Sequence, residues 1–371
     1  MRPGPSVAAR ESTAAPAAPG APAGGGGLTP VPVLLLLTAA LVGSAVAGLA
    51  LGPVRIAPGQ VVDIVLGGLS GRRPTGAFAS IVWDVRMPRV ILGAVVGAGL
   101  AVAGAVLQAL VRNPLADPFL LGASSGASAG AVLVIVLGAG TGALAVVGQL
   151  GVPLAAFAGS LAALVAVYAL ARRGGSLTTG RLILAGVAVQ YVLSALTSLV
   201  LVLAAQPDQL RTVLFWTLGG LGGARWDELA LPAAALLLGT GLLVALARPL
   251  DLLLAGEEGA QTLGLDTARF RAAVFVLTSL VIGVLVAYSG AIGFVGLMVP
   301  HAARMVVGAG HRALLPVSAL GGAVFLTLAD LLARTAAAPE EIPVGVVTAL
   351  VGGPFFLWML RRSTRTEGIT G

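Results

Sequence analysis

The chain has 371 residues, of which 57% are hydrophobic and 10% are charged, and its mean hydropathy is +1.01. A soluble globular protein carries roughly 25% charged residues, so this composition excludes that class and indicates a membrane protein with several spanning helices. Cysteine is absent, which excludes disulfides and thiolate metal ligands. The formal charge of +7 comes from arginines scattered between apolar runs. This pattern is typical of the loops that orient a membrane protein, and it differs from the clustered basic face of a nucleic-acid-binding protein.

Residues 1–28 are rich in Ala, Pro and Gly and predict a flexible N-terminal tail on the cytoplasmic side. The apolar run that follows is longer than the core of a cleaved signal peptide, so we expect a retained first helix. Residues 29–362 form the predicted membrane domain, and residues 363–371 a short cytoplasmic C-terminal tail.

The membrane domain contains ten apolar runs separated by polar or Pro/Gly residues. A hydrocarbon core about 30 Å thick requires roughly 20 apolar residues per helix, and strands of a β-barrel would alternate in polarity, which these runs do not. The predicted fold class is therefore an all-α polytopic membrane protein. The expected spans are 31–51, 88–111, 119–138, 146–171, 181–204, 229–248, 271–289, 293–308, 314–334 and 343–360.

An even number of spans places both termini on one side of the membrane. If that side is cytoplasmic, most inter-span arginines lie inside, as the positive-inside rule favours. These are Arg112, Arg172, Arg173, Arg181, Arg248, Arg269, Arg271, Arg312, Arg361 and Arg362. Residues 52–87 and 205–228 are then the long outer loops, and 249–270 is the long inner connection. The paired Glu257 and Glu258, helical spacing and a break at Gly264 predict two short inner helices divided by a glycine.

The sequence contains few candidates for chemistry. His301 and Arg304 share a helix face, but one histidine without nearby carboxylates is a poor metal site. A GxxxxGK[ST] phosphate loop is absent, so any use of ATP requires another subunit.

Charged residues near the outer ends of the spans are more informative. Asp330 and Arg334 are four residues apart and are expected to pair along one helix. Arg86 and Arg89 lie at the outer start of the second span and are expected to point outward, forming a cationic set with Arg334. An acidic surface on a soluble partner would suit this set, and phospholipid headgroups are the alternative.

Five stretches of this sequence resemble the FecCD-type permeases of ATP-driven importers for iron-siderophores, haem and vitamin B12. They are R-x-P-R at 86–89, GAVLQALVRNPLADPFLLGASSGA at 104–127, WTLGGLGGARW at 216–226, GAIGFVGLMVPHAARMVVG at 290–308 and PEEIPVGVVTALVGGPFFLWML at 339–360. The resemblance runs from about residue 31 to residue 362. It implies a ten-helix permease subunit of a type II importer in the bacterial cytoplasmic membrane.

The resemblance also implies partners. They are a second permease subunit, identical or related, two cytoplasmic ATPase subunits, an extracytoplasmic substrate-binding protein and membrane lipid, with no nucleic acid. No cofactor is expected on this chain, and ATP and Mg²⁺ are used by the ATPase. The expected cargo is an iron-siderophore complex, with haem or cobalamin as alternatives.

Site residues follow from the matching motifs. Arg86, Arg89 and Arg334 correspond to the arginines that meet glutamates of the binding protein in the related vitamin B12 system. The residues expected to dock in the ATPase are Gly256, Glu257, Glu258, Ala260, Leu263 and Gly264. Gln190, Tyr191 and Ser194, on the fifth span, resemble the lining of the substrate path.

Two other classes of protein remain open from the residues alone. An ion-coupled secondary carrier usually has ionisable groups near the membrane midplane, and few are present here. An intramembrane enzyme would need a nucleophile with a base, or metal ligands, inside the spans.

Overall fold

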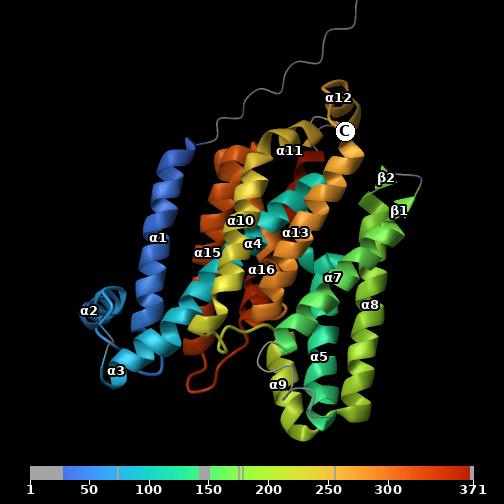
Figure 1. The fold of residues 1–371 in the computed structure, drawn as a ribbon. Helices are drawn as coiled ribbons and strands as arrows, with labels where there is room; N and C mark the ends of the chain where they lie inside the picture. Colours follow the sequence, from blue (N-terminus) through green and yellow to red (C-terminus); the bar gives the residue numbers. More distant parts are fainter. Residues whose placement is uncertain are drawn as a thin grey trace, which may run out of the picture.

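The computed structural model describes residues 28–72, 75–141, 151–173, 176–177, 179–254 and 256–367. These residues form a bundle of long helices that run along one common direction (Figure 1). Each predicted span contains one helix: α1 (Pro30–Ala50), α4 (Met87–Val111), α5 (Ala123–Thr141), α7 (Gly151–Ala171), α8 (Thr179–Ala204), α10 (Ala230–Ala245), α13 (Thr267–Ser289), α14 (Val295–Val307), α15 (His311–Thr335) and α16 (Val344–Glu367). The predicted all-α fold is confirmed.

Within the described ranges, seven helical stretches are long and apolar enough to cross a membrane. The apolar parts of α5, α14 and α16 are shorter, and α14 has only 13 residues. Its start is set by Phe294, which has a φ of 68°, and a short irregular segment separates it from α13. Short helices joined by irregular backbone are tolerated at membrane depth only where protein buries them or a cavity adjoins them. The segment before α14 is therefore expected to be buried by protein or to adjoin a cavity.

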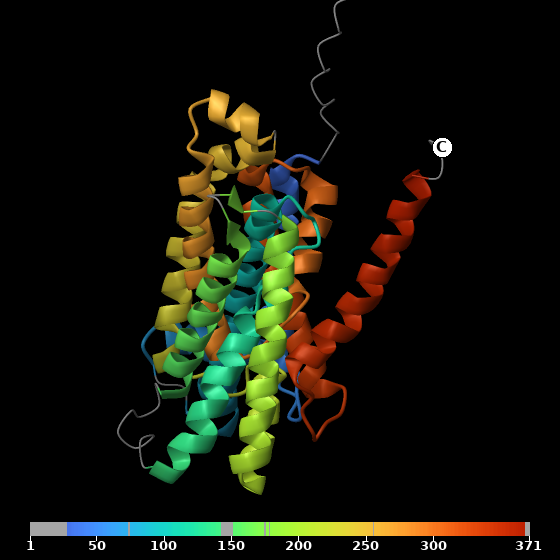
Figure 2. The same ribbon diagram turned by 90° about the vertical axis from the view of Figure 1, so that its right-hand side faces the viewer.

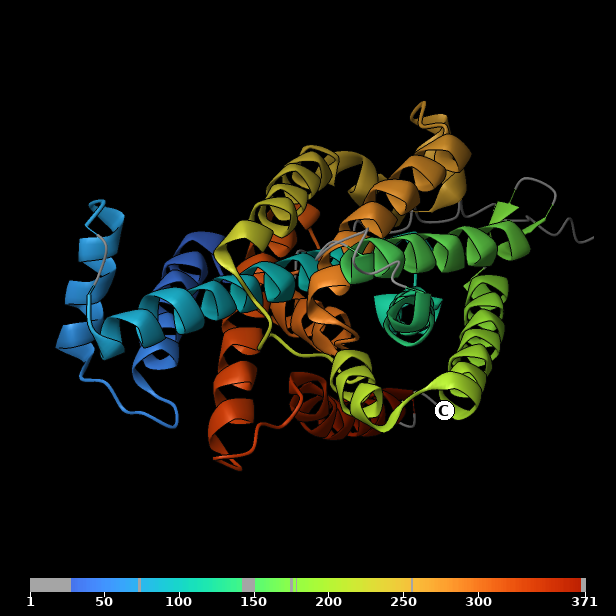
Figure 3. The same ribbon diagram turned by 60° about the horizontal axis from the view of Figure 1, so that its bottom comes forward.

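Helix α4 lies at the centre of the bundle, and nearly all of its residues are buried. Small residues allow its neighbours to approach closely. A Cβ atom on Gly97 would clash with the Gly322 carbonyl of α15, and one on Gly104 would clash with Gly296 of α14. Glycine at these positions therefore allows close helix packing. Viewed from one end, α4 crosses the middle of the bundle, with α1 at one edge and α8 at the other (Figure 3).

The two connections expected to be loops at the outer end are partly helical. Residues 52–87 contain α2 (Pro58–Leu69), α3 (Ala77–Ser80) and the π-helical turn η1 (Ile81–Arg86), which continues into α4. Residues 205–228 contain α9 (Pro207–Thr217) and the 3₁₀ turn η4 (Trp226–Glu228). The Trp226 indole N–H donates to the Trp83 carbonyl at 2.8 Å, so the two connections hold one another. These helices are too short for a spanning pattern, which is why the sequence predicted loops.

The opposite end of the bundle carries α11 (Ala247–Leu254), α12 (Glu257–Thr262) and a two-stranded ribbon of β1 (Arg172–Arg173) and β2 (Ser176–Leu177). The prediction of two short helices in this connection is confirmed, but the predicted position of the break between them is wrong. Gly256 lies between α11 and α12, and Gly264 follows α12. The start of α1 and the end of α16 lie at this same end (Figures 1 and 2). Towards its C-terminus, α16 diverges from the bundle (Figure 2).

Candidate functional sites

Five charged side chains form what we call the outer ionic cluster: Arg86, Arg89, Asp330, Arg334 and Glu341. Arg89 Nε donates to both Asp330 carboxylate oxygens, at 2.9 and 3.1 Å, and its Nη1 donates to Glu341 at 2.9 Å. Arg334 Nε lies 3.2 Å from Asp330 Oδ2, so the pair expected along α15 is confirmed. The cluster joins the start of α4 to the end of α15 and to the segment before α16.

Arg86 and Arg334 also bind the last turn of α1. Arg86 Nη1 donates to the Leu49 carbonyl at 2.6 Å, and Arg334 Nη2 donates to the Gly48 carbonyl at 2.7 Å. Carbonyls at a helix C-terminus lack partners within the helix and carry partial negative charge, so cations stabilise them. The arginines therefore hold α1 against α4 and α15.

The expected outward orientation of these arginines is wrong. Arg86, Arg89 and Arg334 are only 5%, 8% and 4% exposed. A guanidinium at this depth must pair with carboxylates or carbonyls, because an unpaired buried charge is very costly. Glu341, with a side chain that is 43% exposed, is the accessible partner of Arg89. Docking of a binding protein on these arginines stays a prediction.

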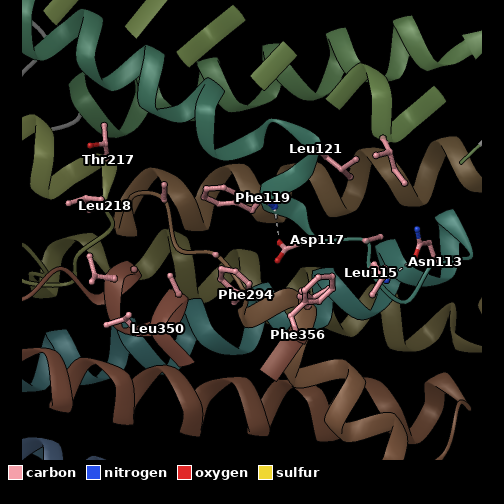
Figure 4. A pocket seen from close by; sticks show the side chains of 18 of the residues that line it. Asn113, Leu115, Asp117, Phe119, Leu121, Thr217, Leu218, Phe294, Leu350 and Phe356 are labelled. Carbon is pink, nitrogen blue, oxygen red and sulfur yellow. Dashed lines mark hydrogen bonds between the residues drawn. The ribbon is translucent and has the colours of Figure 1, made fainter. Parts of the chain in front are cut away.

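A largely apolar, partly open cavity of about 850 Å³ lies beside the segment that precedes α14 (Figure 4). We call it the central chamber. Its wall includes Phe119, Phe294 and Phe356, together with Leu350 of α16. Asp117 is the charged residue of the wall and comes from the turn between α4 and α5. The chamber can accommodate a bulky group that presents mostly apolar surface.

Asp117 joins two of the motif stretches, 104–127 and 290–308. Its Oδ1 accepts the Phe119 N–H at 2.9 Å, and its carboxylate also accepts the Phe294 N–H ahead of α14. Burial raises the pKa of this carboxyl to about 6, because the loss of water disfavours the charged form, and both N–H donors act in the opposite direction. Gln108 adds a second link, donating from Nε2 to the Gly296 carbonyl at 3.3 Å. The sequence analysis identified neither Asp117 nor Gln108 as a candidate site residue.

A second, polar cavity of about 270 Å³ adjoins the chamber and shares Phe119, Thr217 and Ala291 with it. We call it the hydroxyl groove, because hydroxyl and amide side chains form much of its wall. These are Ser124, Ser125 and Ser128 of α5, Gln190, Ser194, Thr197 and Ser198 of α8, and Thr217 of α9.

Two of the predicted path residues, Gln190 and Ser194, thus meet in the hydroxyl groove, whereas Tyr191 is 74% exposed and lies outside its wall. The spacing of Gln190, Ser194, Thr197 and Ser198 puts them on one helix face, a signal that the sequence analysis missed. Ser124 and Ser125 of α5 lie within a motif stretch, and Ser128 follows it at helical spacing from Ser124, but this spacing does not show which helix the serines face. The tertiary structure brings them opposite α8.

The inner loop presents the predicted ATPase-docking residues at one end of the bundle. The Leu265 N–H donates to the Ala260 carbonyl at 3.0 Å and the Gly264 N–H to the Gln261 carbonyl at 2.9 Å, which is the Schellman ending of a helix. Gly264 has a φ of 85°, which suits glycine at this position. Ala260 is buried, Glu258 is exposed and Leu263 is 70% exposed, so the loop offers an apolar and an acidic group to a partner. The side chain of Glu257 lies outside the described residues.

No group of three His, Cys, Asp or Glu side chains among the described residues is placed to hold a metal ion. The geometry instead offers two adjoining cavities, a buried ionic cluster at one end of the bundle and an exposed loop at the other.

The FecCD transport family matches residues 36–362. This chain belongs to the FecCD transport family. The match covers the helical bundle from the second turn of α1 to near the end of α16, including the outer ionic cluster, both cavities and the inner loop. FecCD proteins are multi-pass membrane permeases, and the relatives described next are named as permease proteins of import or transport systems.

The chain is 46% identical to the cobalamin import system permease protein BtuC of Halobacterium salinarum, covering 81% of this chain and 82% of that protein. It is also 46% identical to the hemin transport system permease protein HmuU of Yersinia pestis, over 76% and 83% of the two chains. A permease of unassigned cargo from Bacillus subtilis, YvrB, is 43% identical over 78% and 80%.

Solved structures agree with the fold. A chain described as part of a metal-chelate type ABC transporter in an inward-facing conformation superposes with a TM-score of 0.76. It is 31% identical and the match covers 90% of this chain and 99% of that chain. PsaBC of Streptococcus pneumoniae, at 17% identity and a TM-score of 0.50, shares the fold alone. The chain is thus a permease of the type II ABC importer class.

Proposed function

We propose that this chain forms the membrane path of an ATP-driven importer that carries a metal chelate across the cytoplasmic membrane. The observation that carries this proposal is the 46% identity, over about four fifths of both chains, to a permease of a cobalamin import system. In the proposed assembly, a second permease subunit, identical or related, completes the path. Two cytoplasmic ATPase subunits bind ATP and Mg²⁺, and an extracytoplasmic protein delivers the cargo.

The proposed cargo is cobalamin, haem or an iron-siderophore complex. The names of two relatives, a cobalamin permease and a hemin permease, favour the first two over the iron-siderophore that the sequence motifs suggested. The central chamber and the hydroxyl groove support a bulky cargo with both apolar and hydrogen-bonding surface. Weak contacts along such a wall suit transport, because a tight site would retain the cargo.

The proposed orientation places α11, α12 and both termini in the cytoplasm. ATP would close the ATPase dimer against the inner loop, and the bundle would change the side on which its path is open. Such a shift requires that the ATPase and the binding protein each bind one state of the permease more tightly than the other.

Uptake measurements test the proposal. A strain lacking this gene, with and without its restoration, is offered labelled cobalamin, haem and iron-siderophores in parallel. We expect restored uptake of one chelate, and loss of that uptake when the partner ATPase carries an inactivating substitution. Uptake that persists without any ATPase would contradict an ATP-driven importer and favour an ion-coupled carrier.

A further inference from the structure

A carboxylate of the inner loop binds the first turn of α15. Asp251 of α11 accepts the backbone N–H of His311 at 2.9 Å, and the same oxygen, Oδ1, lies 2.6 Å from His311 Nδ1. With Nδ1 protonated, the ring donates to this oxygen as well. The His311 side chain is 1% exposed and that of Asp251 is 41% exposed, so the contact lies at the edge of the bundle.

This contact caps α15 from another helix. The residue at the N-cap of α15 is Gly310, which offers no side-chain oxygen to the free N–H groups of the first turn. Asp251 supplies that oxygen, and its negative charge also suits the positive end of the helix dipole. A local cap would stabilise α15 alone, whereas a cap from α11 fixes the position of one helix relative to the other.

Helix α15 then continues from this contact to the outer ionic cluster. His311 begins the helix, and Asp330 and Arg334 lie near its end. Nineteen residues at 1.5 Å each span roughly 30 Å, close to the thickness of the hydrocarbon core. Pro316 removes one hydrogen bond in the second turn, but the helix continues unbroken to Thr335. One helix therefore has the inner loop bonded to one end and α1 and α4 bonded to the other.

The remainder of α11 rests on the bundle through Ala247, Leu250 and Leu253, which are buried. Apolar contacts of this kind allow sliding, because they have no preferred direction. The Asp251 contact is directional, since a hydrogen bond weakens steeply when its angle changes. It is thus the contact suited to converting movement of α11 into movement of α15.

We propose that Asp251 and His311 are positioning residues that transmit displacement of the inner loop to α15 and, through α15, to the outer ionic cluster. This inference rests on the proposed function, in which an ATPase binds the inner loop. Asp251 and His311 do not touch cargo, and they act by fixing the start of α15 to α11.

Distance measurements between spin labels test this role. The chain has no cysteine, so cysteines introduced in place of Leu332 of α15 and Val202 of α8 give specific labelling. Leu332 and Val202 are 50% and 82% exposed. The labelled permease is assembled with its ATPase in nanodiscs, and the distance is measured without nucleotide and with a slowly hydrolysed ATP analogue. ATP hydrolysis is recorded on the same samples.

In the labelled parent we expect the nucleotide to shift the distance distribution. In Asp251→Ala we expect the shift to fall to less than half while ATP hydrolysis continues, and Asp251→Asn, which keeps an acceptor oxygen, should retain more of it. Asp266→Ala is the matched control. Asp266 also caps a helix, accepting the Arg269 N–H at 3.1 Å, but it belongs to the same loop and caps the helix that follows it directly.

A merely structural role would lower thermal stability in Asp251→Ala and Asp266→Ala alike and leave both distance shifts unchanged. An unchanged shift in Asp251→Ala, or no shift in the parent, would overturn the inference. Failure of the permease to assemble with any ATPase, or to support its hydrolysis, would instead overturn the proposed function. The two failures are therefore distinguishable.

Discussion

The two ends of α15 are held to their neighbouring helices by different kinds of contact. At the outer end, Asp330 and Arg334 are 2% and 4% exposed, and they share their charges with Arg89 in a closed network. At the inner end, one half-exposed carboxylate, Asp251, holds the first turn. Burial makes the removal of Arg89, Asp330 or Arg334 costly. The outer joint therefore depends on several buried charges, whereas the inner joint depends on one half-exposed carboxylate.

Removing the central carboxylate of the outer ionic cluster should have the largest effect on stability. Asp330→Ala leaves Arg334 without its carboxylate and deprives Arg89 of one of its two. Loss of one partner from a buried ion pair typically costs about 3–5 kcal/mol of unfolding free energy. Thermal unfolding of the purified protein in detergent, followed by circular dichroism, measures the loss.

The matched control for this change is Asp227→Ala. Asp227 pairs with Arg225 at 3.3 Å, but both side chains are more than half exposed. An exposed pair contributes little, so we expect almost no change in the unfolding temperature. If Asp330→Ala and Asp227→Ala were equally stable, the outer joint could not depend on the buried charge of Asp330.

A smaller and local effect is expected in the inner loop. Gly264→Ala forces a side chain into a left-handed backbone conformation, with φ of 85°, and should cost about 1 kcal/mol. Hydrogen exchange of α12 should become faster, while the unfolding temperature of the bundle stays nearly constant. The same change at Gly259, which lies within α12 with open space around it, should leave exchange unchanged or slow it. Equal behaviour of the two variants would contradict a local role for the turn.

The smallest effect on stability is expected for Glu341→Gln, because Glu341 is half-exposed and Arg89 keeps its contacts with Asp330. Glu341→Gln should change the docking of the binding protein more than it changes stability. If a carboxylate of the binding protein engages Arg89, it competes with Glu341, so removal of the Glu341 charge should strengthen binding. Titration of the permease in nanodiscs with purified substrate-binding proteins of the source organism measures this.

Glu340→Gln is the control for docking, since it removes the same charge from the neighbouring residue. Glu340 lies 3.6 Å from Arg211 in a pair that is more than three quarters exposed. A general electrostatic effect would strengthen docking equally in both variants. Stronger docking in Glu341→Gln alone would assign the contact to Arg89. Equal affinity of the two variants for the binding protein would remove Arg89 from the docking surface.

Hydropathy and motif order were sufficient to predict the helical bundle. Every predicted span contains a helix, because an apolar run of sufficient length has one stable arrangement in a bilayer, in which its backbone bonds within itself. The spacing of Asp330 and Arg334 predicted their pair correctly, since residues four apart on a helix are neighbours. Short elements such as α2 and α9 were missed, because they carry no spanning signal.

The sequence by itself thus determined the class, the family and the order of the helices. Only the tertiary structure decided where the charges lie. Arg89 and Asp330 are 241 residues apart in the chain and Asp251 and His311 are 60 apart, so no local spacing could pair them. The same holds for the hydroxyl groove, in which serines of α5 face Gln190 of α8. Local periodicity reports which face of a helix is polar, and packing alone determines what that face meets.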